Sequence, residues 1–342
     1  MENNAGAPAI EARELSRTFK GGIEAVRGVD LSVAEGEVFG FLGPNGAGKS
    51  TAVRMFCTLL PPSGGSASVA GHDVVADGDA VRRTIGVALQ EIGLDPVQTG
   101  RELLELQCGL YGITGSAGRD RAAELLALVG LTEAADRRTK TYSGGMKRRL
   151  DLASALVHQP RVLFLDEPTT GLDPASRLTV WEEVRSINAN GTTIFLTTQY
   201  LEEADELCDR LAIIDHGELV AQGTPESLKA EIGKDVVSVE LHGADADRTR
   251  EVIGELPGLD RVIAEEDALA LFVDDGASSI AQIVRRLDAA DVEVGAISVS
   301  RPSLDDVFLE ATGRRLEGAQ QEQEHADVGA EEDEAAARAV AP

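Results

Sequence analysis

The chain has 342 residues, of which 43% are hydrophobic and only 4% aromatic, so its core must be built mainly from aliphatic side chains. The 59 acidic and 32 basic residues give a net charge of -27, which disfavours direct binding to nucleic acid or anionic lipid. No apolar run approaches the roughly 18 to 20 residues of a membrane span, and residues 1–10 lack the basic and apolar regions of a signal peptide. We therefore expect no nucleic-acid partner and no direct insertion into lipid.

The acidic excess has two possible origins. Only six of the basic residues are lysine. This composition suits a cytoplasm of high salt, where ions screen the repulsion between like charges. A GC-rich genome that favours Arg, Ala and Gly, together with an acidic tail, would give the same composition. Stability that rises between low and molar KCl would indicate the first origin.

Three cysteines, Cys57, Cys108 and Cys208, are far apart in the chain and have no metal-ligand spacing. This pattern predicts buried free thiols in a reducing compartment.

The N-terminal part of the chain predicts strands around one glycine-rich loop. Residues 10–33 have the pattern of short strands with turns. The apolar run 38–42 predicts a buried strand, and a helix is expected from about residue 49 to residue 60, where Pro61 and Pro62 stop it. Further strands are expected at residues 66–69 and 85–89.

The middle of the chain becomes helical. Residues 99–157 have apolar side chains at helical spacing, whereas the apolar runs at 162–165, 193–197 and 210–214 predict strands, with a helix at 175–189. Alternating strands and helices favour a mostly parallel sheet. The helical stretch should therefore be a subdomain inserted into an α/β fold.

A second unit is expected from residue 233. Its predicted order is β-α-β-β-α-β, which is typical of a ferredoxin-like domain, and a short helix follows near residue 304. The tail is rich in Gln, Glu, Asp and Ala and predicts disorder. The predicted divisions are residues 1–232, containing the helical subdomain at about 99–157, residues 233–313, and the tail at 314–342.

The sequence GPNGAGKST matches the phosphate-binding pattern G-x-x-x-x-G-K-[ST] and lies between the predicted strand and helix. Its glycines let backbone N–H groups approach phosphates, and the helix N-terminus favours anions. Lys49 should reach the β- and γ-phosphates of ATP, and Ser50 should ligate Mg²⁺. The expected nucleotide-binding residues are Gly43, Pro44, Asn45, Gly46, Ala47, Gly48, Lys49, Ser50 and Thr51.

An acidic pair follows the predicted strand at 162–165. The strand should deliver Asp166 and Glu167 to the carboxyl edge of the sheet, where ligands bind in open α/β folds. Asp166 is suited to the Mg²⁺ shell and Glu167 to polarising the attacking water. The alternative is an acidic pair that caps a helix.

The order of these motifs resembles that of ATP-binding-cassette (ABC) ATPases. The resemblance rests on GPNGAGKST, Gln90, YSGGM at 142–146, LDEP, GLDP at 171–174 and TTQYLEEAD at 197–205. It implies a P-loop cassette with a mixed or parallel sheet and a helical subdomain, covering roughly residues 10–225. It also implies a homodimer that encloses two ATP molecules with Mg²⁺.

In that family the YSGGM segment is the signature loop. Ser143, Gly144 and Gly145 would then contact the γ-phosphate bound by the other protomer, which a helix N-terminus favours. The plainer interpretation is that Ser143 only caps a helix.

The resemblance also implies roles for three scattered residues. Gln90 would contact Mg²⁺ or water and couple to the membrane partner, and Asp173 would communicate between the two sites. Phe19 would stack on adenine, although the sequence allows it equally to be a core residue.

The chain departs from the family at two places. The signature usually begins with Leu and ends with Gln, where this chain has Tyr142 and Met146. Gln199 stands where the family usually has His, and Gln cannot carry a proton. We hypothesise that Gln199 positions the γ-phosphate and Glu167 is the base, so that the catalytic residues are Lys49, Glu167 and Gln199.

YSGGMKRRL, TTQYLEEAD and the closing LDDVFLEATG resemble the daunorubicin-resistance (DrrA-type) branch of these ATPases. This implies the ATPase subunit of an exporter of drug-like or lipid-like compounds. It would be bound peripherally to the cytoplasmic face of the membrane through a permease on a separate chain. Residues 304–309 would be either a docking element or a helix that closes the small domain. The alternatives are a soluble cassette ATPase without a transporter and a weakly hydrolysing regulatory module.

Overall fold

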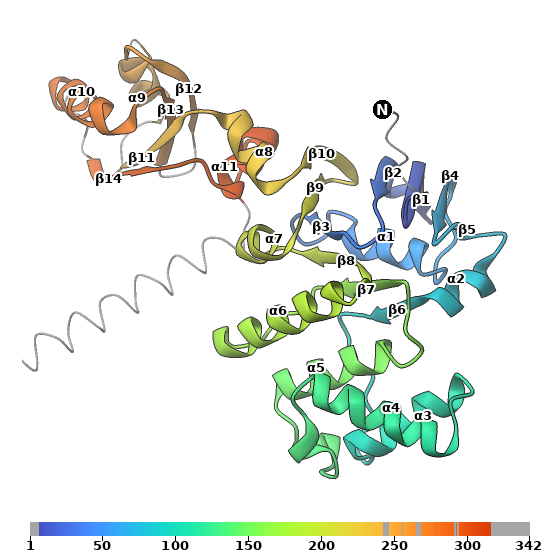
Figure 1. The fold of residues 1–342 in the computed structure, drawn as a ribbon. Coiled ribbons are helices and arrows are strands. Elements are labelled where there is room, and N and C mark those ends of the chain that lie inside the picture. Colours follow the sequence, from blue (N-terminus) through green and yellow to red (C-terminus); the bar gives the residue numbers. More distant parts are fainter. Residues whose placement is uncertain are drawn as a thin grey trace, which may run out of the picture. The chain divides into compact units, whose positions relative to one another are not determined.

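The computed structural model describes residues 7–241, 246–254, 256–264, 268–290, 292 and 294–315. The chain divides into two compact units, Met1–Gln222 and Gly223–Pro342 (Figure 1). The boundary predicted from the sequence, residue 233, lies later in the chain, directly after helix α8 (Pro225–Ile232). The predicted disordered tail lies outside the described residues except for Arg314 and Arg315.

The first unit contains a six-stranded sheet in the order β10-β9-β3-β8-β7-β6, in which β3 runs parallel to β8 and β9, and β7 runs parallel to β6 and β8. The predicted α/β core is therefore confirmed. Its strands are β3 (Val38–Leu42), β6 (Ile85–Ala88), β7 (Val162–Asp166), β8 (Thr193–Thr198), β9 (Arg210–Asp215) and β10 (Glu218–Gly223).

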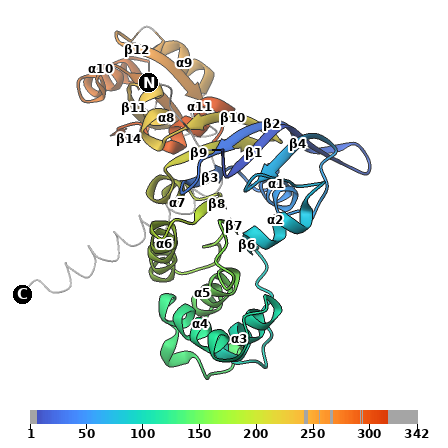
Figure 2. The same cartoon turned by 45° about the vertical axis from the view of Figure 1, so that its right-hand side comes forward.

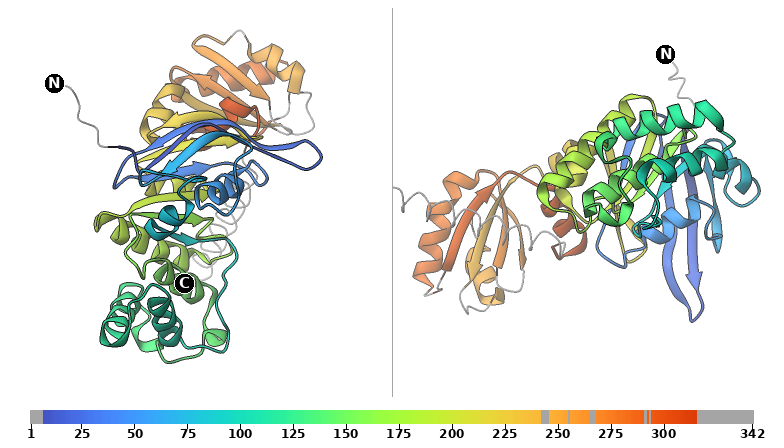
Figure 3. Two further views of the ribbon diagram at one scale, coloured as in Figure 1. Left: turned by 90° about the vertical axis from the view of Figure 1, so that its right-hand side faces the viewer. Right: turned by 90° about the horizontal axis from the view of Figure 1, so that it is seen from below.

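A second, antiparallel sheet of the first unit has the order β2-β1-β4-β5. It comprises β1 (Ile10–Phe19), β2 (Ile23–Val33), β4 (Gly64–Val69) and β5 (His72–Asp73). The long β1–β2 hairpin, which turns at Gly21 and Gly22, is clear in Figure 3. Helix α1 (Lys49–Phe56) shares one buried apolar cluster with strands of both sheets.

Helix α1 is shorter than predicted. It ends at Phe56, and the backbone N–H groups of Thr58 and Leu59 bond to the carbonyls of Met55 and Arg54. Thr58 has a φ of 60°. These bonds are the two of a Schellman motif, so the helix closes before it reaches Pro61.

The predicted helical subdomain consists of α3, α4 and α5 beyond the β6 edge of the sheet (Figure 2). Thr99 begins α3 with a capping box completed by Glu102. Short 3₁₀ turns at Thr132–Ala134 and Thr139–Thr141 precede α5. The helices of the first unit are α2 (Gly78–Thr84), α3 (Gly100–Leu110), α4 (Gly115–Leu128), α5 (Gly144–Ala155), α6 (Pro174–Ala189) and α7 (Leu201–Leu207).

The second unit has the sheet order β12-β13-β11-β14 with antiparallel neighbours, as a ferredoxin-like domain requires. Its elements are α8 (Pro225–Ile232), β11 (Asp235–Leu241), α9 (Ala246–Ile253), β12 (Leu259–Ala264), β13 (Ala268–Val273), α10 (Gly276–Ala289), β14 (Val294–Ser300) and α11 (Leu304–Thr312). Helix α11 packs on α8, and its apolar side chains Leu304, Val307, Phe308 and Leu309 are buried. Within this unit α11 is thus a closing helix.

Cys57, Cys108 and Cys208 are buried and free, as the sequence predicts. Among the described residues, no helix combines the length and the apolar character needed to cross a bilayer.

Candidate functional site

The glycine-rich loop leaves β3 and enters α1 in a conformation that requires glycine. Gly46 and Gly48 have φ angles of 81° and 111°, in the left-handed region. A Cβ atom on Gly48 would lie 2.3 Å from the carbonyl oxygen of Ala25, and one on Gly43 would lie 2.2 Å from that of Ile214. The loop therefore brings its backbone N–H groups to the N-terminus of α1 without side chains in the way.

This loop forms a cavity of about 210 Å³ together with residues far away in the sequence. Gln90 follows β6 and Glu167 follows β7, so parallel strand ends bring both to the loop. The lining residues are Ala25, Pro44, Asn45, Gly46, Gly48, Lys49, Ser50, Thr51, Gln90 and Glu167. The structure thus gathers most of the predicted loop residues with two predicted from elsewhere.

Lys49 is 4% exposed and is held by oxygens only. Its Nζ donates to the carbonyls of Gly43 at 2.6 Å and Pro44 at 3.1 Å, and lies 3.2 Å from Oε1 of Glu167. Burial lowers the pKa of Lys49, and Glu167 offsets part of this change. The ammonium is therefore placed where phosphate oxygens can replace these partners.

Asp166 is 2% exposed and accepts hydrogen bonds from two hydroxyl groups. The Oγ of Ser50 donates to Oδ1 of Asp166 at 3.2 Å, and Oγ1 of Thr197 donates to the same oxygen at 2.6 Å. A serine hydroxyl beside a carboxylate at a phosphate loop is an all-oxygen donor set, which fits Mg²⁺. No sequence pattern indicated a role for Thr197, because only the β7–β8 pairing places it opposite Asp166.

Glu167 has an unusual backbone conformation, and both oxygens of its carboxylate have partners. Its φ is 49°, rare for a residue with a side chain, and its N–H donates to Oγ1 of Thr197 at 3.0 Å. Its Oε2 accepts from Nε2 of Gln90 at 3.0 Å and from Oγ1 of Thr170 at 3.3 Å. The side chain is thus aimed at the cavity rather than capping a helix.

The signature segment begins α5 and does not line the cavity. Ser143 is the N-cap of α5 and its Oγ accepts from the N–H of Met146 at 3.2 Å, so the capping interpretation holds. Ser143 and Gly144 are exposed. Tyr142 is buried and its hydroxyl donates to the carbonyl of Ala134 at 2.7 Å, so the departure at this position serves packing.

Three further predicted residues also lie outside the cavity lining. Asp173 is exposed as the N-cap of α6, and hydrogen bonds from Ser176 lower its pKa. Phe19 is 38% exposed at the end of β1, so it is not a core residue. Gln199 is half-buried directly after β8, where the carbonyl of Thr198 accepts from the N–H of Gly43 at 3.2 Å.

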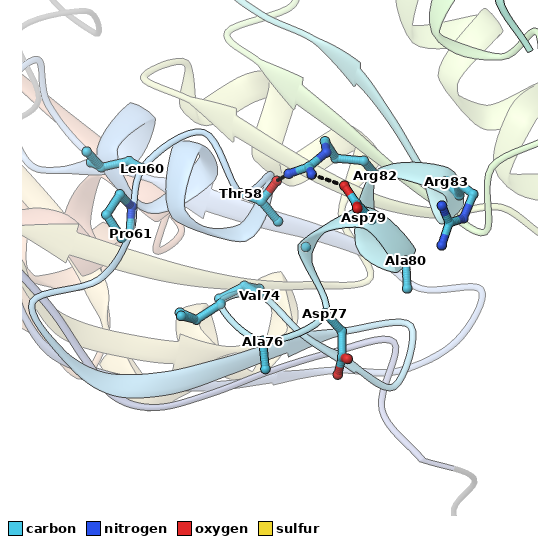
Figure 4. Close-up of a pocket in the computed structure, with 12 residues that line it drawn as sticks. Thr58, Leu60, Pro61, Val74, Ala76, Asp77, Asp79, Ala80, Arg82 and Arg83 are labelled. Carbon is cyan, nitrogen blue, oxygen red and sulfur yellow. Dashed lines mark hydrogen bonds and ion pairs between the residues drawn. The ribbon is translucent and has the colours of Figure 1, made fainter.

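A larger cavity of about 530 Å³ lies elsewhere in the first unit and carries none of the predicted site residues (Figure 4). Its Arg82 is engaged with Asp79 and donates to Oγ1 of Thr58 at 2.8 Å. The smaller cavity at the glycine-rich loop is therefore the functional candidate, because there the charged groups converge.

Comparison with known proteins shows the family to which the chain belongs. The family model "ABC transporter" matches residues 26–170, and the model "ATP-binding protein DrrA1-3-like, C-terminal domain" matches residues 223–312. The chain is 47% identical to the daunorubicin/doxorubicin resistance ATP-binding protein DrrA of Streptomyces peucetius over 91% of this chain and 94% of that protein. It is 42% identical to the Nod factor export ATP-binding protein I of Burkholderia thailandensis over 85% of this chain and 93% of that protein.

A solved structure gives the same fold. It is a dimeric ATP-binding cassette in a post-hydrolysis state with bound ADP and phosphate. It is 28% identical, has a TM-score of 0.58, and the match covers 63% of this chain and 98% of that one.

The fold and the site define an ABC-type ATPase, the ATP-binding and ATP-hydrolysing subunit of a transporter. Within that class, the chain belongs to the DrrA-type branch, since both of its units match this branch.

Proposed function

We propose that two copies of this chain form two composite sites, each completed by Ser143–Gly145 of the other copy. The observation that carries this proposal is the separation of the motifs within one copy. Lys49, Gln90 and Glu167 converge on one cavity, whereas the exposed N-terminus of α5 is not part of its lining. A helix N-terminus with an exposed hydroxyl favours an anion, and the γ-phosphate is the anion that a second copy would present. The related cassette that was solved as a dimer supports this arrangement.

Within one site the residues have distinct tasks. Lys49 binds the β- and γ-phosphates of ATP, and Ser50, Asp166 and Gln90 would hold Mg²⁺. Mg²⁺ bound there would neutralise charge on the phosphate oxygens. Glu167 accepts the proton of the attacking water.

Three residues outside the cavity lining complete the assignment. Gln199 positions the γ-phosphate, Asp173 links the two sites, and Phe19 stacks on adenine. The partial exposure of Phe19 at the end of β1 supports this last role, and the guanidinium of Arg17 lies over its ring at 5.0 Å from the centroid.

The partner is a membrane permease on a separate chain, which holds this subunit at the cytoplasmic face of the membrane. The relatives named for drug resistance and for Nod factor export support an exporter of drug-like or lipid-like compounds. A groove of about 360 Å³, largely apolar, lies between the sheet edge and the helical subdomain, and includes Leu59, Tyr111 and Leu89. A permease segment bound there would press on Leu89 and thereby on the neighbouring Gln90.

Complementation between two inactive variants tests the composite site. Lys49→Ala removes the phosphate contact, and Ser143→Glu places a carboxylate where it repels the γ-phosphate but is tolerated at a helix N-terminus. Each variant alone should hydrolyse ATP poorly. When they are co-expressed and the mixed dimers are purified through two different affinity tags, roughly half of the wild-type rate should be recovered, because each mixed dimer carries one intact site of two.

The control mixes Lys49→Ala with the double variant Lys49→Ala/Ser143→Glu, which leaves no intact site. Wild-type turnover by Ser143→Glu alone, or no recovery in the mixed pair, would contradict the composite site.

A further inference from the structure

Arg148 connects the signature helix to the two strand ends that carry Gln90 and Glu167. It lies on α5, and its side chain is 5% exposed. Its Nη1 donates to the carbonyl of Leu89 at 2.6 Å, its Nη2 to that of Asp166 at 3.0 Å and its Nε to that of Pro168 at 2.9 Å. The pair with Asp151 at 3.4 Å lies within the same helix.

The three carbonyls are not scattered. Leu89 immediately precedes Gln90, while Asp166 and Pro168 flank Glu167. The side chains of Gln90 and Glu167 meet at 3.0 Å. One guanidinium therefore fixes the backbone next to Gln90 and the backbone next to Glu167. The hydrogen bond between these two side chains is their only contact among the described residues.

The chemistry of the side chain suits this task. A guanidinium has five N–H donors in a rigid planar fork, so it can hold three carbonyls in fixed directions at once. A lysine ammonium can reach one or two of them without fixing their plane. Burial lowers the pKa of Arg148, and the negative charge of Asp151 is the largest effect that opposes this change. The positive charge of Arg148 is therefore stabilised by nearby protein groups rather than by solvent.

We propose that Arg148 is a positioning residue for ATP hydrolysis, which sets Glu167 and Gln90 in register with the signature helix. This inference rests on the proposed role of Glu167. Movement of α5, whose N-terminus carries Ser143, is transmitted through Arg148 to the base and to its amide partner. Arg148 itself does not line the nucleotide cavity. It shares a smaller cavity of about 90 Å³ with Gln90 and Glu167.

The test compares Arg148→Met and Arg148→Lys in the full chain, with Arg121→Met as a matched control. Arg121 is 14% exposed, donates to the carbonyls of Leu156 and Val157, and pairs with Glu124 three residues later, but it contacts no strand end of the site. Arg148→Met should lower kcat about 10- to 100-fold with KM for ATP changed less than about twofold, because the base is misplaced while the phosphate loop is intact. Arg148→Lys should recover part of kcat, and Arg121→Met should keep it.

A second measurement separates positioning from general stability. In a Glu167→Gln background, Arg148→Met should have little further effect on kcat, because the group that it positions has already lost its function. The same fold-loss in both backgrounds, or a kcat of Arg148→Met within about twofold of Arg121→Met, would overturn the inference. Should Arg148→Met fail to fold, Arg148→Lys in both backgrounds gives the same comparison. Wild-type activity of Glu167→Gln would instead refute the proposed role of Glu167.

Discussion

At the scale of single residues, the site is organised by one carboxylate. One carboxylate oxygen of Glu167 accepts a hydrogen bond from Gln90, and the other forms an ion pair with Lys49. Its backbone N–H donates to the hydroxyl of Thr197. A carboxylate held on both oxygens at the cavity wall has one orientation, which is what a base for a bound water requires. Gln199 has no comparable network among the contacts described.

The first prediction separates these two residues. Glu167→Gln should lower kcat for ATP hydrolysis by roughly 10² to 10⁴, the usual contribution of a general base, while ATP affinity changes little. Gln199→Ala should lower kcat less, since it removes only a positioning contact. Steady-state turnover and nucleotide titration measure both effects. Full activity in Glu167→Gln with loss only in Gln199→Ala would refute the assignment.

A buried acid on α6 gives a second prediction, on stability. Glu183 is 7% exposed, lies 3.9 Å from Nη1 of Arg149, and its Oε2 has no hydrogen-bond partner among the described residues. Burial raises its pKa from 4.5 to about 8, and Arg149 offsets only part of this. Between these two values the folded state holds a proton that the unfolded state has lost, so stability falls as pH rises, by at most about 1.4 kcal/mol per pH unit.

Glu183→Gln should remove this dependence. The variant should gain stability over the wild type at about pH 8, and the gain should vanish towards about pH 5, where Glu183 is protonated in the folded state. Urea unfolding at the two pH values measures the difference. An exposed residue that does not act on Glu183, changed as Glu133→Gln, is the control and should show no such pH-dependent gain.

At the scale of elements, the signature helix α5 is packed against α6 through a glycine. A Cβ atom on Gly145 would lie 2.8 Å from Oγ and 3.0 Å from Cβ of Ser176, whose hydroxyl is held by Asp173 at 2.7 Å. On Gly144 the nearest atom would belong to Leu172 at 3.7 Å, an ordinary contact. The second glycine is therefore needed for packing, besides any role towards phosphate.

This contrast makes the third prediction. Gly145→Ala should lower the free energy of unfolding by about 1 kcal/mol or more, because α5 and α6 must separate to admit the methyl group. Gly144→Ala should be neutral or slightly stabilising, since alanine is the better helix former. Chemical denaturation of both variants measures this, and equal effects would show that the α5–α6 packing yields easily.

At the scale of the whole molecule, the proposed function requires two copies of the chain. The first unit supplies a phosphate loop, an acidic pair and a signature helix, but the signature helix does not line the cavity that the loop forms with Gln90 and Glu167. The second unit is a ferredoxin-like domain whose last helix is used for its own packing. The apolar residues of α11 are thus occupied within the unit, and the largely apolar groove of the first unit is the surface proposed for the permease.

The sequence by itself determined the class of the fold and the ligand chemistry. The phosphate loop is a local object: strand, glycines, lysine and helix follow one another, so their positions depend on backbone rules alone. The acidic pair after an apolar strand and the β-α-β-β-α-β order are local in the same sense. The exact end of α1 was missed, because a left-handed Thr58 closes the helix before Pro61. The start of the second unit at Gly223 and helix α8 were also not predicted.

Tertiary structure decided what depends on strands meeting side by side. It placed Thr197 on Asp166, joined Gln90 to Glu167, and brought Arg148 to three carbonyls from two strand ends. It also showed that Phe19 lies outside the core and that the apolar face of α11 is buried. These contacts join residues that are distant in the chain, and their partners follow from sheet order and helix packing, which no local pattern of residues encodes.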